Sequence, residues 1–253
     1  MQTKNRRKSV LEELQKNKSV SISKLAAQLD VSSVTIRRDL NRLAEQGIVT
    51  LLHGGAVLNE GTAAITSVMV REKRLLTEKS HIAAFCAELI KEGNSVYIDC
   101  GSTPKSIAEA VMDKKNIVVL SHSLAVMNVL ANAKDIQLIS VPGVYIAAKK
   151  GFYGQLALEF ISNFQLDIAF LGVGGLNLES GLTGPDIDDA QIKKVLIKKA
   201  KKKVIAVDHT KIGKEYFVKA CDISDVDMLV TDKQADLHMI EKIRRMGVEV
   251  FLV

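Results

Sequence analysis

The first fifty residues carry apolar side chains at helical spacing. The three stripes are Val10, Leu11 and Leu14; Leu25, Ala26 and Leu29; and Ile36, Leu40 and Leu43. They predict helices over about residues 3–16, 22–29 and 33–46. Ser21 and Ser32 are suitable N-caps for the second and third helices, and Gly47 is a suitable stop for the third. Only the turn at Asp30-Val31 separates these two helices, which is typical of a helix-turn-helix.

The stretch IVTLLHGGAVL, which follows the third helix, is rich in β-forming residues around His53, Gly54 and Gly55. It predicts a short hairpin, the wing of a winged helix-turn-helix. Small and polar residues come next. We therefore expect a winged helix-turn-helix over residues 1–57, a linker over 58–74 and a larger domain over 75–253.

Beyond the linker, short β-rich runs alternate with helical stretches. The runs cover residues 95–99, 117–121, 136–141, 167–173, 203–208, 227–231 and 248–253. The helical stretches cover residues 78–92, 104–113, 123–132, 186–201 and 233–246. This alternation is typical of an α/β fold in which helices cover both faces of a largely parallel sheet.

The distribution of charge points to the kind of partner. The net charge is +6, and residues 1–57 hold ten Lys and Arg against five Asp and Glu, an excess that favours phosphate binding. No apolar run is long enough for a membrane span, and the basic N-terminus lacks the apolar stretch of a secretory signal. We therefore expect a cytoplasmic protein with no membrane partner. The three cysteines show no metal-ligand spacing, so neither a metal nor another cofactor is expected.

The predicted third helix offers polar residues on the faces that its apolar stripe leaves free. They are Ser32, Ser33, Thr35, Arg37, Arg38 and Asn41. Groups at a helix N-terminus bind phosphate, and arginine binds guanine or phosphate, so we expect this helix to contact DNA. Asp39 is expected to orient one of the two arginines. In the wing, His53 and Gly54 are further candidates, because glycine allows a close backbone approach. The alternative for Arg37 and Arg38 taken alone is a solvated helix face.

The larger domain offers a candidate anion site where predicted strands end. The candidate residues are Asp99, Gly101, Ser102, Thr103, Gly174, Lys193 and Lys211. Residues 99–103 lie between a strand and a helix, where hydroxyls and helix N-terminal amides can hold a phosphate. Lys211 follows another strand, at the sheet edge where α/β proteins bind ligands. The alternative for residues 99–103 is an ordinary strand-to-helix turn.

The stretch from Ser21 to Ala56 is similar to the N-terminal signature of the DeoR family of bacterial repressors. The matching positions are Leu25, Ala26, Val31, Ser32, Thr35, Ile36, Arg37, Arg38, Asp39, Leu40, Leu43, Gly47, His53, Gly54, Gly55 and Ala56. Members often carry an arginine two residues before the His-Gly-Gly, where this chain has Leu51. A phosphate contact from that arginine is therefore expected to be missing.

Residues 75–253 resemble the sensor domain of the same family. The matching features are the turn at 99–103, Gly154, Asp167, Gly172 to Gly175, Gly181 to Thr183, Ala190 with Lys193, Asp208 with Lys211, and Asp227 with Thr231-Asp232. The resemblance implies a fold like that of ribose-5-phosphate isomerase and a phosphorylated sugar or related metabolite as effector. Pro104 and Pro142 depart from the family pattern, and Pro104 removes one amide donor.

These observations predict a transcriptional regulator, most simply a repressor of a carbohydrate operon. It would bind double-stranded operator DNA as a homo-oligomer, a dimer or a tetramer, until the effector releases it. No catalytic residue is expected. One alternative is a sugar-phosphate isomerase with Asp186, Asp188 or Asp189 as its base. The other is a ligand-free nucleoid-associated protein.

Overall fold

The computed structural model describes residues 3–45, 48–58, 71–72 and 74–253. The chain divides into two compact units, Met1–Val70 and Arg71–Val253. The predicted helix stop at Gly47 and most of the predicted linker lie outside the described residues.

The smaller unit combines three helices with a three-stranded sheet. The helices are α1 (Thr3–Asn17), α2 (Ile22–Gln28) and α3 (Ser33–Glu45). The strands are β1 (Ser19–Ser21), β2 (Val49–Leu52) and β3 (Gly55–Leu58), with β3 between the other two. The predicted apolar stripes meet in one core, where Val10, Leu14, Ile36 and Leu40 are completely buried. The three helices and the hairpin are confirmed, and β1 is a strand that the sequence pattern did not indicate.

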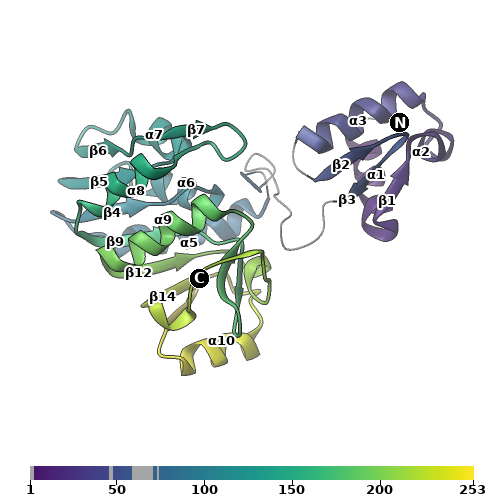
Figure 1. Ribbon diagram of the computed structural model, residues 1–253. Helices are drawn as coiled ribbons and strands as arrows, with labels where there is room; N and C mark the ends of the chain where they lie inside the picture. Colours follow the sequence, from purple (N-terminus) through teal and green to yellow (C-terminus); the bar gives the residue numbers. More distant parts are fainter. Residues whose placement is uncertain (1–2, 46–47, 59–70, 73) are drawn as a thin grey trace. The chain divides into compact units, whose positions relative to one another are not determined.

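Seven parallel strands form the centre of the larger unit. They are β4 (Ser95–Ile98), β5 (Ile117–Ser121), β6 (Ile136–Ser140), β9 (Leu166–Leu171), β12 (Ala200–Ala206), β14 (Met228–Thr231) and β15 (Glu249–Leu252). Their order in the sheet is β15-β14-β12-β9-β4-β5-β6, and each neighbouring pair is parallel. Figure 1 shows this order from β6 at the top to β14 below. These strands are the seven runs predicted from the sequence.

Helices cover both faces of this sheet and create two hydrophobic cores. One core contains residues of α5 (Leu76–Glu88), α6 (Ser102–Ala110) and α7 (Leu124–Leu130). The other contains residues of α8 (Gln155–Ser162), α9 (Ile187–Lys199) and α10 (Leu237–Arg245). Successive residues of β4 alternate between them, because Val96 and Ile98 belong to the first core and Tyr97 to the second. The predicted α/β architecture is therefore confirmed.

Two smaller β-structures were not predicted. An antiparallel sheet contains β10 (Gly175–Asn177), β11 (Gly181–Gly184) and β13 (Val218–Cys221). A hairpin contains β7 (Val144–Ile146) and β8 (Gly151–Tyr153). Single 3-10 turns lie at η1 (His209–Lys211) and η2 (Ile223–Asp225). Within the described part of the chain, no helix combines the length and the apolar character that a membrane crossing requires.

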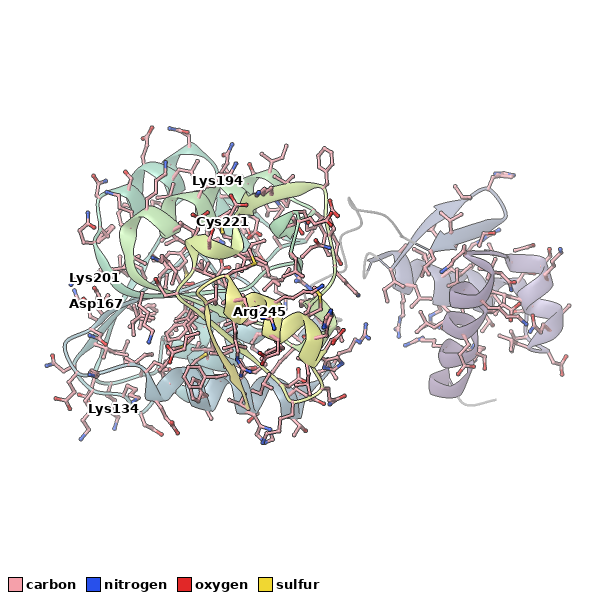
Figure 2. All side chains as sticks on the ribbon, turned by 90° about the horizontal axis from the view of Figure 1, so that it is seen from below. Lys134, Asp167, Lys194, Lys201, Cys221 and Arg245 are labelled. Carbon is pink, nitrogen blue, oxygen red and sulfur yellow. The ribbon has the colours of Figure 1, made fainter. Side chains whose placement is uncertain are left out.

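Ion pairs tie the amino ends of neighbouring strands together. Asp167 accepts a hydrogen bond from the Ser95 main-chain N–H at 2.9 Å and pairs with Lys201 Nζ at 2.9 Å. Figure 2 shows the Asp167 and Lys201 side chains next to each other. The hydrogen bond from Lys201 is the main cause that lowers the pKa of Asp167 to about 2. This edge is structural and lies at the end of the sheet opposite the candidate effector residues.

Candidate DNA-binding surface and effector site

The exposed side of α3 carries the predicted DNA-binding residues of the helix. Ser32, Ser33, Arg37, Arg38 and Asn41 are exposed, and Thr35 is half-buried. The Ser32 hydroxyl accepts a hydrogen bond from the Thr35 main-chain N–H at 3.2 Å, which confirms Ser32 as the N-cap. The helix therefore starts at the predicted residue and presents both arginines to solvent, as contact with a DNA groove requires.

Asp39 does not orient either of those arginines, contrary to the prediction. Its side chain is 2% exposed and accepts hydrogen bonds from Arg6 Nε at 2.6 Å and Arg7 Nε at 2.9 Å, both on α1. Burial by itself would raise the pKa of Asp39, but the hydrogen bonds and charges of Arg6 and Arg7 outweigh it and lower that pKa. Asp39 thus fastens α1 to α3 and leaves Arg37 and Arg38 free of this carboxylate.

The wing places its two glycines under different constraints. Gly54 has a φ of +80°, a left-handed conformation that favours glycine, and a Cβ there would meet nothing within 4 Å. At Gly55 a Cβ would lie 2.2 Å from the carbonyl oxygen of Val20, so the absence of a side chain lets β3 pair closely with β1. His53 and Gly54 are exposed at the tip, and their contact with DNA stays a prediction. Leu51 is 42% exposed.

The predicted effector residues lie where the strand order of the large sheet reverses. From β4 the chain moves outward to β5 and β6, and then returns to β9 on the other side of β4. Ligands of open α/β sheets bind outside the carboxyl ends of the strands at such a switch point. Asp99 follows β4 and Gly172 follows β9, and the Gly172 main-chain N–H donates to Asp99 Oδ2 at 3.0 Å.

Gly101 to Thr103 form the start of α6 beside Asp99. Gly101 has a φ of +154°, a region in which only glycine is comfortable. The first main-chain bond of the helix runs from the Lys105 N–H to the Gly101 carbonyl oxygen at 3.0 Å. The N–H groups of Ser102 and Thr103 precede it and point out of the helix end. Pro104 lies in the same first turn, where an N–H would have no partner inside the helix.

Lys193 is already paired with two carboxylates. Its Nζ lies 2.9 Å from Asp99 Oδ2 and 2.7 Å from Asp189 Oδ2, and its side chain is 3% exposed. Burial alone would lower the pKa of Lys193, but the two carboxylates outweigh burial and raise it. Asp99, Asp189 and His122 have ligating atoms within 4.8 Å of one another, yet the Lys193 ammonium occupies the position of a cation between the carboxylates. We call this group, together with Tyr97, the Asp99 cluster.

A second group holds Lys211 and has an excess of positive charge. Lys79 of α5 is almost fully buried, and its Nζ donates to the carbonyl oxygens of Arg71 and Arg74. Asp208 acts electrostatically on both Lys79 and Lys211, as does Arg71. Arg71 Nε is buried without a hydrogen-bond partner among the described residues. We call Arg71, Lys79, Asp208 and Lys211 the Lys211 cluster, which has three cationic side chains and one carboxylate. Its further charged neighbours are Glu72, Arg74 and Lys214.

Of the predicted effector residues, Asp99 and Lys193 lie in the Asp99 cluster and Lys211 lies in the Lys211 cluster, whereas Gly101 to Thr103 form the start of α6. Lys193 belongs with Asp99, and Lys211 belongs with residues that sequence reasoning missed, Lys79 and Arg71. A signal for Lys79 was present, because it precedes Ile82, Ala83 and Cys86 at helical spacing and so lies on the apolar stripe of α5. Gly174 is explained by packing, since a Cβ there would lie 3.2 Å from the Thr183 carbonyl oxygen.

Comparison with known families covers both units. Residues 6–62 match the DeoR-like helix-turn-helix domain, and residues 75–233 match the DeoR C-terminal sensor domain. The chain belongs to the DeoR family. It is a DNA-binding transcriptional regulator, as the resemblance implied.

Individual relatives align along almost the whole chain. The glycerol-3-phosphate regulon repressor of Escherichia coli K12 is 33% identical over 241 residues, which cover 95% of each chain. The HTH-type transcriptional repressor GlcR of Bacillus subtilis 168 is 28% identical over 244 residues, 96% of this chain and 94% of that protein. Ribose 5-phosphate isomerase A of Neisseria gonorrhoeae aligns over 53% of this chain and 52% of its own, with 21% identity and a TM-score of 0.39, a likeness that says nothing about activity. The relatives are named as regulators, which supports a regulator rather than an isomerase.

Proposed function

We propose that this DeoR-family protein represses a carbohydrate operon and is released from its operator by a phosphorylated sugar or a related metabolite. The Lys211 cluster carries the effector half of the proposal. Cationic side chains outnumber carboxylates in and beside this cluster at the carboxyl edge of the sheet, which makes it suited to a phosphate group. The names of relatives as repressors of glycerol-3-phosphate and other regulons support the same class of effector.

The DNA half rests on the exposed face of α3. Arg37, Arg38 and Asn41 are exposed on a helix whose opposite face packs against the core, the arrangement by which such a helix enters the major groove. One copy presents one recognition helix. We therefore propose that a homo-oligomer binds two half-sites about one helical turn of DNA apart.

The Lys211 cluster offers a path from effector to DNA affinity. Lys79 holds the carbonyl oxygens of Arg71 and Arg74, which open the larger unit and lie at the end of the predicted linker. A phosphate that draws Lys79 toward itself weakens this hold. The effector releases DNA only to the extent that it binds the low-affinity arrangement more tightly than the other.

Substitution of the arginines tests the DNA half. We expect Arg37→Ala and Arg38→Ala each to weaken operator binding by about 1–3 kcal/mol if the lost contact is to a base. The matched control is Arg245→Ala on α10, which removes the same charge from the exposed surface of the other unit (Figure 2). Fluorescence anisotropy with an operator fragment measures the affinity. Wild-type affinity in both α3 variants contradicts the assignment.

Substitution of Lys211 tests the effector half. We expect Lys211→Ala to bind the operator normally but to need far more sugar phosphate for release. Lys201→Ala is the control, because Lys201 lies at the opposite end of the sheet strands and pairs with Asp167. Titration of the DNA complex with tagatose 6-phosphate, fructose 1-phosphate and glycerol 3-phosphate measures release. Normal release of the Lys211 variant excludes this lysine from the site.

A further inference from the structure

Two buried polar atoms in the Asp99 cluster have no partner. His122 Nε2 and Asp99 Oδ1 both belong to completely buried residues, and neither has a hydrogen bond within the described residues. The two atoms lie 3.9 Å apart, which is too far for a direct hydrogen bond. Buried polar groups almost always have a hydrogen-bond partner in folded proteins. We therefore expect a further hydrogen-bonding group between these two atoms.

The proton positions on His122 follow from its other neighbour. The Tyr97 hydroxyl lies 2.6 Å from His122 Nδ1. Burial is the main cause that raises the pKa of Tyr97 and lowers the pKa of His122 to about 4, so the phenol keeps its proton and the ring is neutral. Among the described residues the phenol has no other side-chain hydrogen-bond partner, so its proton is donated to Nδ1. The ring proton therefore lies on Nε2, and Nε2 is a donor.

The opposite atom is an acceptor. Asp99 Oδ2 already accepts from the Gly172 main-chain N–H at 3.0 Å and from Lys193 Nζ at 2.9 Å, which leaves Oδ1 open. A single oxygen about 2.8 Å from each atom would hydrogen-bond to both. That oxygen must accept from Nε2–H and donate to Oδ1. A hydroxyl group does both, whereas a carbonyl or fully ionised phosphate oxygen only accepts.

We infer that His122 and Asp99 together bind one hydroxyl group of the effector, with Tyr97 as the positioning residue that fixes the proton on His122. This inference rests on the proposed function, because it assigns the polyhydroxy end of the phosphorylated effector to the Asp99 cluster. Asp99 follows β4 and His122 follows β5, so both lie at the carboxyl edge of the sheet beside the start of α6. A buried water molecule is the other source of such an oxygen.

A strap formed by residues 147–150, between β7 and β8, lies beside His122 and Cys100. The Tyr153 ring meets the His122 ring edge-on with centroids 5.0 Å apart, and Lys149 Nζ lies 4.5 Å from the Tyr153 ring centroid. Lys149 also pairs with Asp186, and the Cys100 thiol donates to the Lys149 carbonyl oxygen at 3.1 Å. Because Asp99 and His122 are completely buried, a ligand that lacks the hydroxyl leaves two polar atoms unpaired, which makes the site selective.

The test compares the affinity of the full chain for sugar phosphates with its affinity for inorganic phosphate. Titration calorimetry gives the Kd of inorganic phosphate divided by the Kd of the tightest of tagatose 6-phosphate, fructose 1-phosphate and glycerol 3-phosphate. We expect His122→Phe, which keeps a ring but removes both nitrogens, to lower this ratio at least about tenfold. Tyr97→Phe should lower it by a smaller factor. His238→Phe, at an exposed position of α10, should leave it unchanged.

The outcomes separate this inference from the proposed function. If water fills the gap, both variants lower the Tm but keep the wild-type ratio, and the inference is overturned. If His122→Phe does not fold, Tyr97→Phe decides, because it removes a single oxygen and keeps the shape of the ring. A wild-type chain that binds none of the four probes overturns the proposed function and the inference together. An unchanged ratio in variants that still bind overturns the inference alone.

Discussion

At the scale of single residues, Asp39 shows how one carboxylate decides which arginines are available. The sequence places it directly after Arg37 and Arg38, but in α3 neighbouring residues point in different directions. Asp39 points inward, where Arg6 and Arg7 reach it from α1. A separation of more than thirty residues hides this pairing from any local pattern. The two arginines beside it in the sequence remain on the exposed side.

Replacement of Asp39 should loosen the smaller unit. We expect Asp39→Asn to lower its free energy of unfolding by about 2 kcal/mol, because two hydrogen bonds to charged donors weaken in a buried position. Since the pKa of Asp39 is lowered in the folded state, its stabilising effect is present above the unfolded value of about 4 and is lost as the pH falls below it. Urea unfolding at pH 7 and at acid pH measures both effects. Asp30→Asn, at an exposed turn, is the control, and an equal loss there contradicts the role of Asp39.

Lys211 should make effector binding depend on pH. Burial lowers the pKa of Lys211 to about 8, against the opposing effect of Asp208. A phosphate binds the protonated amine, so affinity is full below this pKa and falls as the pH rises through about 8. Titration of a sugar phosphate between pH 7 and 9 measures the fall. Lys211→Arg should abolish it, because arginine stays charged, and a fall that persists in this variant assigns it to another group.

At the scale of elements, the wing depends on a glycine that faces a strand rather than the solvent. We expect Gly55→Ala to destabilise the smaller unit by about 2–3 kcal/mol, because its Cβ would meet the backbone of Val20. Gly54→Ala should cost only about 1 kcal/mol, since it introduces φ strain without a clash. Urea unfolding of the two variants compares them directly. Equal losses of stability in the two variants would mean that β1 moves away from the added Cβ of residue 55 at no energetic cost.

The elements that the sequence predicted are those with a repeating environment. The strands of the large sheet are buried on both faces, so they appear in the sequence as continuous apolar runs. The helices appear as apolar residues at helical spacing. The antiparallel sheet escaped prediction because β10 and β11 are short and contain three glycines, which have low β-propensity. The part of the candidate site that the sequence predicted consists of residues in loops that directly follow strands. Lys79, Arg71 and His122 were missed because their roles depend on which distant segments the fold brings beside them.

At the scale of the whole molecule, the proposed function links two binding events by one free energy. If a sugar phosphate lowers operator affinity by some factor, operator DNA must lower the affinity for that sugar phosphate by the same factor. We expect about 5–150-fold, the usual range of such coupling. Calorimetric titration of the effector into the free protein and into the operator complex measures the second factor, and anisotropy measures the first. Unequal factors would show that a further species, such as a different oligomer, takes part.

The pairing of Arg6 and Arg7 with Asp39 has a consequence for how the protein responds to salt. Contact between a cationic side chain and DNA releases condensed counterions, and the number released sets the slope of log affinity against log salt concentration. An arginine whose Nε atom is hydrogen-bonded to a buried carboxylate releases no counterion through that atom. The ion stoichiometry of operator binding should therefore follow the exposed Arg37, Arg38 and Arg42, and should be smaller than the ten basic residues of the first 57 would suggest.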